Sequence, residues 1–425
     1  MISRHKAILL VAGFLIVVVI VAVSGVAASP SHQEPEFALF VTTTEDHNDG
    51  ACDGDCSLRE AIIAANQSQF DDIIWVPSGT YTLTLEGSGE DDALTGDLDI
   101  ASSLAIVGDG AETTIIDAGG MTSDPDRVLH IDPAGSGAYE VNLWGLTITG
   151  GDVAEVNGGG IYNRDATMML HSCIITGNSA HWGGGIWSTF GSMSGYNITV
   201  SSNSASSGGG IALGATPMNL YESTVSGNSG DLYGGGISSG FGTLRVENST
   251  ISGNSASFGG GISSGIGKLH VENSTISGNS AAADSGGGIR SIIGSTELYN
   301  TLVAMNPSGG DCRWESTDDI LSLGYNLDSD NTCNLTAEGD LPNTDPRLGP
   351  LQDNGGPTFT HALLFGSPAM DAGDNSSCPA TDQRGFTRPM DGDGDGTATC
   401  DIGAFEHLGL RGRFPLVFSS YGPSP

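Results

Sequence analysis

Hydrophobic and polar residues alternate in short runs through the middle of the chain. Leu244 and Val246 alternate with charged residues, and after Asn248 a second short run places Ile251 between two hydroxyl residues. A period of two over a few residues is typical of β-strands, and no helical period accompanies it. The pattern predicts two short strands joined by a turn in each unit, and a Gly-Gly-Gly-Ile string predicts a third.

Two marker strings repeat in phase along the chain. Gly-Gly-Gly-Ile recurs at steps of 25, 25, 26, 25 and 27 residues, beginning at Gly158, Gly183, Gly208, Gly234, Gly259 and Gly286. A Ser/Thr-rich run ends in Asn at the same steps, at Asn178, Asn203, Asn228, Asn254, Asn279 and a degenerate Asn306. Three strands in about 25 residues make one coil of a parallel β-helix. We therefore predict an all-β, right-handed parallel β-helix, a pectate-lyase-like solenoid with regular coils over residues 140–306.

Equivalent residues of successive coils should stack into columns about 4.8 Å apart. One inward column is expected to contain Ile148, Ile175, Val200, Val225, Ile251, Ile276 and Val303. The repeated Asn residues are expected to adopt left-handed turn geometry and to bond to their neighbours in a ladder. Cys173 aligns with inward positions, which predicts a buried free thiol rather than a nucleophile.

The segments on either side of the repeat differ in composition. Residues 56–66 follow a polar loop and place apolar side chains on one face, which predicts a short helix capping the N-terminal end of the core. Irregular early coils are expected in residues 37–139, an irregular C-terminal cap or a small attached domain in 307–407, and a tail in 408–425. Six of the seven cysteines lie in these flanks. Sequence-local pairing, one of fifteen arrangements, would join Cys52 to Cys56, Cys312 to Cys333 and Cys378 to Cys400.

The first 28 residues predict export from the cell. Residues 4–6 carry two positive charges, residues 7–23 are apolar and uncharged, and the small residues 26–28 form a cleavage site. The apolar run also fits an uncleaved anchor. We therefore expect a secreted or cell-surface protein that meets a membrane only through this segment.

The charge balance narrows the classes of partner. The chain contains 14 Lys and Arg against 50 Asp and Glu, which gives a formal net charge of −36. Proteins that bind nucleic acid need Lys and Arg to displace counterions, so nucleic acid and anionic membrane surfaces are excluded as partners. The sequence makes no prediction of an oligomeric state.

Several strings resemble known bacterial families. Cys-Ser-Leu-Arg-Glu-Ala at Cys56–Ala61 resembles the motif that names the CSLREA-domain proteins. The repeats resemble chlamydial polymorphic outer-membrane proteins, except that Gly stands where that family has Ala in Gly-Gly-Ala-Ile. Strings at 354–358 and 401–406 resemble the choice-of-anchor domain. These resemblances imply a bacterial surface or secreted protein, and they imply no reaction.

One outward face combines aromatic, acidic and basic side chains. Aligned on the turn Asn, its two columns supply His171, Tyr196, Tyr221, Arg245, His270 and Tyr299 as candidate glycan-binding residues. Glu247 and Glu272 are the candidate catalytic carboxylates, because polysaccharide hydrolysis needs a pair of them and adjacent like charges shift their protonation. An ordinary solvated face explains the same columns without a ligand.

Two further features suggest binding chemistry. Asp391, Asp393 and Asp395 alternate with Gly as in the first half of a Ca²⁺ loop, and Asp401 stands near the position of the closing acid. We expect a structural Ca²⁺ there and no other cofactor, against the alternative of a solvated acidic turn. A second outward face repeats Thr-x-Ser or Thr-x-Thr, which suits ice or water binding but also follows from β-propensity alone.

The sequence therefore predicts a non-enzymatic surface module that binds glycans or neighbouring cells through the side of a β-helix. The alternative is a polysaccharide lyase or glycoside hydrolase that uses the face around Glu247 and Glu272.

Overall fold

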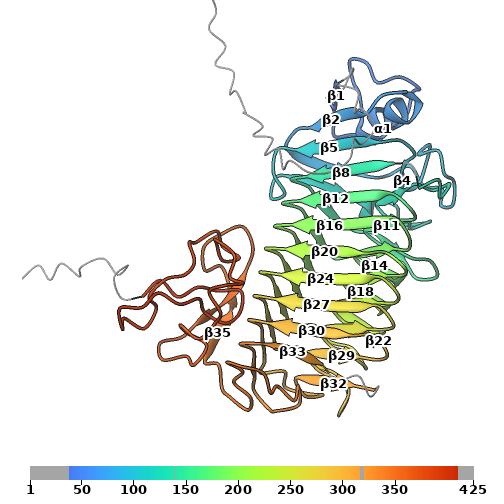
Figure 1. The fold of residues 1–425 in the computed structure, drawn as a ribbon. Helices are drawn as coiled ribbons and strands as arrows, with labels where there is room; N and C mark the ends of the chain where they lie inside the picture. Colours follow the sequence, from blue (N-terminus) through green and yellow to red (C-terminus); the bar gives the residue numbers. More distant parts are fainter. Residues whose placement is uncertain (1–37, 138, 316–319, 410–425) are drawn as a thin grey trace, which may run out of the picture. The chain divides into compact units, whose positions relative to one another are not determined.

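The computed structural model describes residues 38–137, 139–315 and 320–409. In this part of the chain, successive coils stack and their strands pair in parallel to form the sheets of a β-helix, which confirms the predicted all-β solenoid (Figure 1). The predicted leader, residues 1–28, and residues 410–425 of the predicted tail lie outside the described residues. None of the helices within the described ranges has the length and apolarity needed to cross a membrane.

Three long parallel sheets, A, B and C, form the walls of the solenoid. Sheet A contains β1 (Ala38–Phe40), β2 (Asp72–Val76), β5 (Leu104–Gly108), β8 (Glu140–Trp144), β12 (Thr167–His171), β16 (Ser192–Tyr196), β20 (Met218–Tyr221), β24 (Thr243–Glu247), β27 (Lys268–Glu272), β30 (Thr296–Tyr299) and β33 (Leu321–Gly324). Sheet B contains β3 (Gly79–Thr82), β6 (Thr114–Asp117), β9 (Thr147–Thr149), β13 (Ile174–Thr176), β17 (Thr199–Ser201), β21 (Thr224–Ser226), β25 (Thr250–Ser252), β28 (Thr275–Ser277), β31 (Leu302–Ala304) and β34 (Leu327–Asp328). Sheet C contains β4 (Leu98–Ile100), β7 (Leu129–Ile131), β11 (Ile161–Asn163), β15 (Ile186–Ser188), β19 (Ile211–Leu213), β23 (Ile237–Ser239), β26 (Ile262–Ser264), β29 (Ile289–Ser291) and β32 (Cys312–Trp314).

The remaining elements are short. A fourth parallel sheet, D, contains β10 (Asp152–Val153), β14 (Ser179–Trp182), β18 (Ser204–Ser207) and β22 (Ser229–Tyr233). Strands β35 (Leu348–Gln352) and β36 (Thr360–Leu363) form an antiparallel hairpin, α1 spans Leu58–Gln67 and a 3-10 turn spans Ala118–Gly120. We predicted three strands per coil and missed sheet D, because its small polar residues show no alternation.

The repeated Asn residues form a buried ladder inside the solenoid. Asn228 donates through Nδ2 to Val200 O at 2.9 Å and to Asn254 Oδ1 at 3.0 Å. Its own Oδ1 accepts from the backbone N–H and the Nδ2 of Asn203, both at 3.0 Å. Each amide thus satisfies backbone and side-chain groups of the next coil, which confirms the predicted ladder.

The predicted left-handed geometry of the ladder Asn residues is wrong. The residue before each of them takes the positive φ instead, as at Gly177 and Gly227. The Asn side chain points inward to reach its neighbours, and its own φ is not positive. Asn with positive φ occurs at a different corner, between sheets A and B, at Asn197, Asn248, Asn273 and Asn300.

The Gly-Gly-Gly string meets two separate constraints. Gly158 has a φ of +73°, which L side chains rarely adopt. Gly160 has an ordinary φ, but an added Cβ would lie 2.6 Å from Gly185 O and 3.0 Å from Asn178 Nδ2. The first Gly therefore makes the turn, and the later ones allow adjacent coils to approach each other.

The CSLREA-like string builds the N-terminal cap. Ser57 is the N-cap of α1 and forms a capping box with Glu60. Arg59 is buried, binds Asp46 with Nε 2.7 Å from Oδ1, and donates to the carbonyls of the 93–97 loop. Cys56 forms a disulfide with Cys52. The helix predicted for residues 56–66 is confirmed, and the motif both caps the core and shapes the loop beside it.

Cysteine pairing follows sequence proximity. Disulfides join Cys52 to Cys56, Cys312 to Cys333 and Cys378 to Cys400, as the sequence-local arrangement predicts. Cys173 is free and buried, and burial raises the pKa of its thiol to about 11. This confirms the predicted inert thiol, because a nucleophilic Cys needs a lowered pKa.

The C-terminal region packs on the outer face of sheet B. Gln383 is fully buried and its Nε2 donates to Thr224 Oγ1 at 3.0 Å, while its Oε1 accepts from Thr250 Oγ1 at 2.6 Å. Ala404 N donates to Thr275 Oγ1 at 3.1 Å. Apolar residues of this region, including Ile402, share a core cluster with Leu302. The predicted C-terminal cap is therefore bonded to the side of the solenoid over several coils.

We expect Asn228→Ala to lower the free energy of unfolding by about 3 kcal/mol, because the change leaves buried backbone groups of two neighbouring coils without partners. Chemical denaturation of the full chain measures the loss. Asn219→Ala, at a half-buried outward position of β20 in the same coil, should change stability by less than about 0.5 kcal/mol. Equal effects of the two changes would contradict the role of the ladder.

We also expect Gln383→Ala to loosen the C-terminal region from sheet B, since Thr224 and Thr250 lose their shared buried partner. Limited proteolysis should cut the 345–409 region several-fold faster while the solenoid stays intact. The exposed Gln352→Ala in the same region serves as the control, and unchanged cleavage by both variants would refute the docking role of Gln383.

Candidate functional site

The outward column of sheet A brings the candidate residues together. Parallel register pairs His171 with Tyr196, Tyr196 with Tyr221, Tyr221 with Glu247, and Glu247 with Glu272. We call this line of side chains the sheet A column. The structure places these side chains in one line across the sheet, at the C-terminal ends of its strands. Their role in binding remains a prediction.

Four rings of the sheet A column form a continuous stack. Trp144 lies 3.8 Å from His171, His171 lies 4.9 Å from Tyr196, and Tyr196 lies 4.9 Å from Tyr221, measured between ring centroids. The planes are within 14° of parallel. Trp144 is 42% exposed and the other three rings are half-buried. The stack therefore presents ring edges and tyrosine hydroxyls to solvent, because each ring covers the face of its neighbour.

Burial lowers the pKa of His171, so this imidazole is neutral at neutral pH and stacks as an uncharged ring. Burial, Tyr196 and Glu247 raise the pKa of Tyr221, which keeps its hydroxyl protonated as a hydrogen-bond donor. His171 and Tyr221 are thus both uncharged at neutral pH.

Aligning the coils of the sequence on their turn Asn does not predict the N-terminal half of the sheet A column. Trp144 pairs with His171, and Trp75 and Phe40 lie further along the same line through Val107. Trp75 is 40% and Phe40 is 60% exposed. The signal was present, because Trp144 precedes Gly145-Leu146-Thr147-Ile148 as His171 precedes its own turn and strand, but the early coils have unequal lengths.

A charged cluster continues the sheet A column after Tyr221. Arg245 lies between the two candidate carboxylates, with Nε 3.0 Å from Glu247 Oε2 and Nη2 2.9 Å from Glu272 Oε2. Glu247 and Glu272 are register partners, which confirms their predicted adjacency, and the guanidinium that binds both offsets their mutual repulsion. A general acid of a glycoside hydrolase instead needs surroundings that keep its proton in place.

His270 extends the cluster by one more coil. Its Nε2 lies 3.1 Å from Glu272 Oε2, and its Nδ1 lies 3.3 Å from Glu297 Oε2. The hydrogen bond to Glu272, together with that to Glu297, raises the pKa of His270 against the opposing effect of burial. The imidazolium is thereby favoured between two carboxylates.

Tyr299 is separated in function from the other candidates. Its hydroxyl donates to Asp374 of the C-terminal region, and Asn300 beside it bonds to the same segment. The hydroxyl of Tyr299 therefore helps to dock the C-terminal region. Among the described residues, no such bond to that region is found for the hydroxyls of Tyr196 and Tyr221.

The Thr and Ser face of sheet B is not a free array. Thr224, Thr250 and Thr275 are at most 3% exposed, and they bond to Phe359, Gln383 and Ala404 of the C-terminal region. Ser252 lies 2.8 Å from His361 Nε2. These coils therefore do not offer the flat water-binding or ice-binding face that was one interpretation of the pattern, because the face is an internal interface.

The structure regroups the residues predicted to hold Ca²⁺. Asp371 joins Asp391 and Asp393, with ligand oxygens within 4.8 Å of one another. Asp395 accepts from Thr397 N, and the buried Asp401 accepts from the backbone N–H groups of Asp371 and His407. Asp395 and Asp401 therefore lie outside this acidic group. Ca²⁺ binding remains a prediction for Asp391 and Asp393, and Asp371, which the sequence did not suggest, lies with them.

A comparison with known protein families supports the fold. A family model described as a right-handed beta helix region matches residues 136–303, which confirms the predicted handedness. The solved structure described as "Crystal structure of pectate lyase Pel9A" is similar, at 14% identity and a TM-score of 0.44, over 88% of this chain and 97% of that chain. A search of curated proteins gives no match. The chain thus contains a right-handed parallel β-helix.

We expect the contribution of His270 to stability to depend on pH. Its pKa is raised above the ordinary 6.5, so the stabilisation is complete below about pH 6.5 and is lost as pH rises through the folded-state pKa. His270→Gln should therefore destabilise by less than about 1 kcal/mol at low pH, since the site is partly solvated, and have little effect at high pH.

Denaturation midpoints between about pH 5.5 and about pH 8.5 would measure this difference. The exposed His181→Gln on β14 is the matched control, since it removes an imidazole outside the charged cluster. A His270→Gln effect that grows with pH would have the wrong sign for this ion-pair arrangement.

Proposed function

We propose that this chain is an exported, non-enzymatic module that binds a neutral polysaccharide along the sheet A column. The observation that supports it most is the unbroken stack from Trp144 to Tyr221, which crosses four adjacent coils on an open face. Three disulfides in the chain and the apolar segment at residues 7–23 support export to an oxidising compartment.

The chemistry of the sheet A column suits a linear sugar polymer. Tyr combines a large apolar ring with a hydroxyl that donates and accepts hydrogen bonds, and sugars have the same mixture of C–H surface and hydroxyls. Adjacent coils repeat about every 4.8 Å, which is similar to the length of one sugar unit in an extended chain. A polymer lying across the strands would therefore meet a ring edge at each step from Trp144 to Tyr221, with hydroxyls at Tyr196 and Tyr221.

The charged cluster would then contact the polymer beyond Tyr221. Arg245 has a side chain 37% exposed, so its remaining N–H groups are available to sugar hydroxyls while Glu247 and Glu272 hold it in place. Fixing the guanidinium before binding reduces the entropy lost on binding.

The overall charge favours a neutral glycan over a uronate polymer. The formal net charge of −36 creates a field that repels polyanions, and the candidate face has two carboxylates for each guanidinium that binds them. Arg245 is already neutralised by these carboxylates, so little positive charge remains for a polyanionic ligand.

We favour binding over catalysis because the candidate carboxylates are used by Arg245. A glycosidase separates the roles of acid and base by placing its two carboxyls in different environments. Here Glu247 and Glu272 share one partner through equivalent oxygens. The two carboxylates therefore serve to hold the guanidinium of Arg245 in position.

We expect Tyr196→Ala and Tyr221→Ala each to weaken binding to a neutral oligosaccharide roughly tenfold, because each removes one ring edge and one hydroxyl. A glycan array with the full exported chain identifies the ligand, and calorimetry with the best neutral oligosaccharide measures the variants. Trp187→Ala, an aromatic truncation on the outer face of sheet C, should leave the affinity unchanged.

Absence of binding to every neutral glycan on the array would sink the proposal, as would equal affinity for the Tyr variants and the wild type. Release of reducing or unsaturated sugar ends, lost in Glu247→Gln or Glu272→Gln, would replace it with an enzymatic function.

A further inference from the structure

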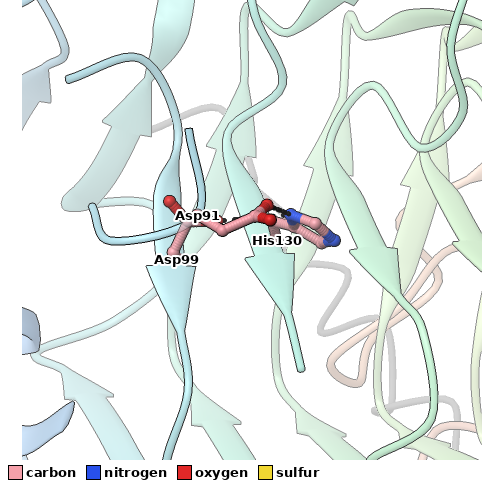
Figure 2. A group of neighbouring side chains, drawn as sticks. All are labelled: Asp91, Asp99 and His130. Carbon is pink, nitrogen blue, oxygen red and sulfur yellow. Dashed lines mark ion pairs between the residues drawn. The ribbon is translucent and has the colours of Figure 1, made fainter. Parts of the chain in front are cut away.

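A second group of chemically capable side chains lies on sheet C, near the N-terminal cap. Asp99 on β4 and His130 on β7 are register partners in adjacent parallel strands, and both point outward. Asp91 reaches them from the loop that precedes β4. Figure 2 shows the carboxylate of Asp91 and the imidazole of His130 directed at each other beside Asp99.

The three ligand atoms converge on one point. His130 Nδ1 lies 3.2 Å from Asp99 Oδ1 and 3.5 Å from Asp91 Oδ1, and all three atoms lie within 4.8 Å of one another. Asp99 is fully buried, and its Oδ1 makes no hydrogen bond among the described residues; its ion-pair partner is His130, which is charged only when protonated. A buried carboxylate oxygen without a hydrogen bond carries a large free-energy cost unless another positive group satisfies it.

The spacing of these atoms matches a metal-ligand set. Carboxylate oxygen and imidazole nitrogen bind Zn²⁺ at about 2.0–2.2 Å, and tetrahedral ligands at that distance lie roughly 3.4 Å apart. The two measured separations from His130 Nδ1, 3.2 Å and 3.5 Å, fall on either side of this value. The nitrogen ligand favours a transition metal, since Ca²⁺ and Mg²⁺ prefer oxygen.

The surrounding structure holds the group in place. The second oxygen of Asp99, Oδ2, accepts from Ala93 N at 2.9 Å, which fixes its carboxylate against the loop. Arg59 of the N-terminal cap donates to the carbonyls of Ala93, Gly96 and Asp97 in the same loop. The ring of Tyr162 stacks on His130 at 4.9 Å, so the imidazole plane is also constrained.

Further carboxylates make the neighbourhood attractive to a cation. Asp97 and Asp126 lie beside the group, with Arg127 Nε 3.2 Å from Asp97 Oδ2 and 3.8 Å from Asp126 Oδ1. One guanidinium does not neutralise all four carboxylates of this region. The side chain of Asp91 is 65% exposed, so solvent reaches the group from that side and can supply the remaining ligand.

We propose that Asp91, Asp99 and His130 bind a divalent transition-metal cation of the Zn²⁺ class, with water completing its coordination. Asp99 and His130 form the rigid part of the site, and Asp91 closes it from the loop that Arg59 shapes. The site is separate from the glycan-binding face on sheet A, and it stands or falls independently of that function.

Titration of the chelator-stripped full chain with Zn²⁺ alone would test the proposal, with Co²⁺ absorption as a second readout. We expect one saturable site, and a visible Co²⁺ band whose intensity indicates four-coordinate geometry. His130→Gln should weaken Zn²⁺ binding at least about a hundredfold, and Asp91→Asn at least about tenfold. Because Asp91 is exposed, that second variant does not depend on the folding of a buried substitution.

Asp391→Asn is the matched control, because it removes one carboxylate from the other acidic group and should leave the Zn²⁺ affinity unchanged. Equal affinity of wild type, His130→Gln and Asp91→Asn would overturn the proposal. So would loss of binding in Asp391→Asn alone, which would place the cation in the C-terminal region.

Discussion

Many buried polar groups of the solenoid find their hydrogen-bond partners in an adjacent coil, so the spacing of the coils has to place those partners in reach. The Asn ladder states this constraint in its simplest form, since Asn228 bonds at once to Asn203 below it and Asn254 above it. The steps between markers stay close to 25 residues for the same reason. The longer step before Gly286 is taken up by a turn at Ala282–Ser285, outside the main walls, so the inward columns keep their register.

The inward half of the molecule follows from sequence because its physics is periodic. The columns of Ile and Val, the ladder and the Gly strings repeat in phase, and each was predicted at its observed position. The backbone geometry of the ladder was not, because an amide can satisfy its neighbours from either conformation and only the inward direction decides between them. Sheet D escaped prediction since Ser and Ala carry no alternation that would distinguish a strand from a loop.

The contacts of the outward side chains can be predicted only in part from the sequence, because many of their partners lie far away along the chain. Thr224 bonds to Phe359 across 135 residues, and no spacing within the repeat announces that partner. Tyr299 is diverted to Asp374 in the same way. The group on sheet C was missed for another reason: Asp99 and His130 are 31 residues apart, in coils whose lengths differ from the repeat. Periodicity in the sequence therefore predicts the columns of the regular coils, but it does not predict which side chains come together in the irregular coils.

The docking of the C-terminal region has a mechanical consequence. Repeat proteins whose coils touch only their nearest neighbours can open one coil at a time, because each interface is independent of the others. Here one folded segment grips β21, β25 and β28 and the turn before β31. A load along the solenoid axis that separated any of these coils would also have to break that shared grip. The coils from β21 to β31 are therefore mechanically coupled through the C-terminal region, and they resist tension as one unit.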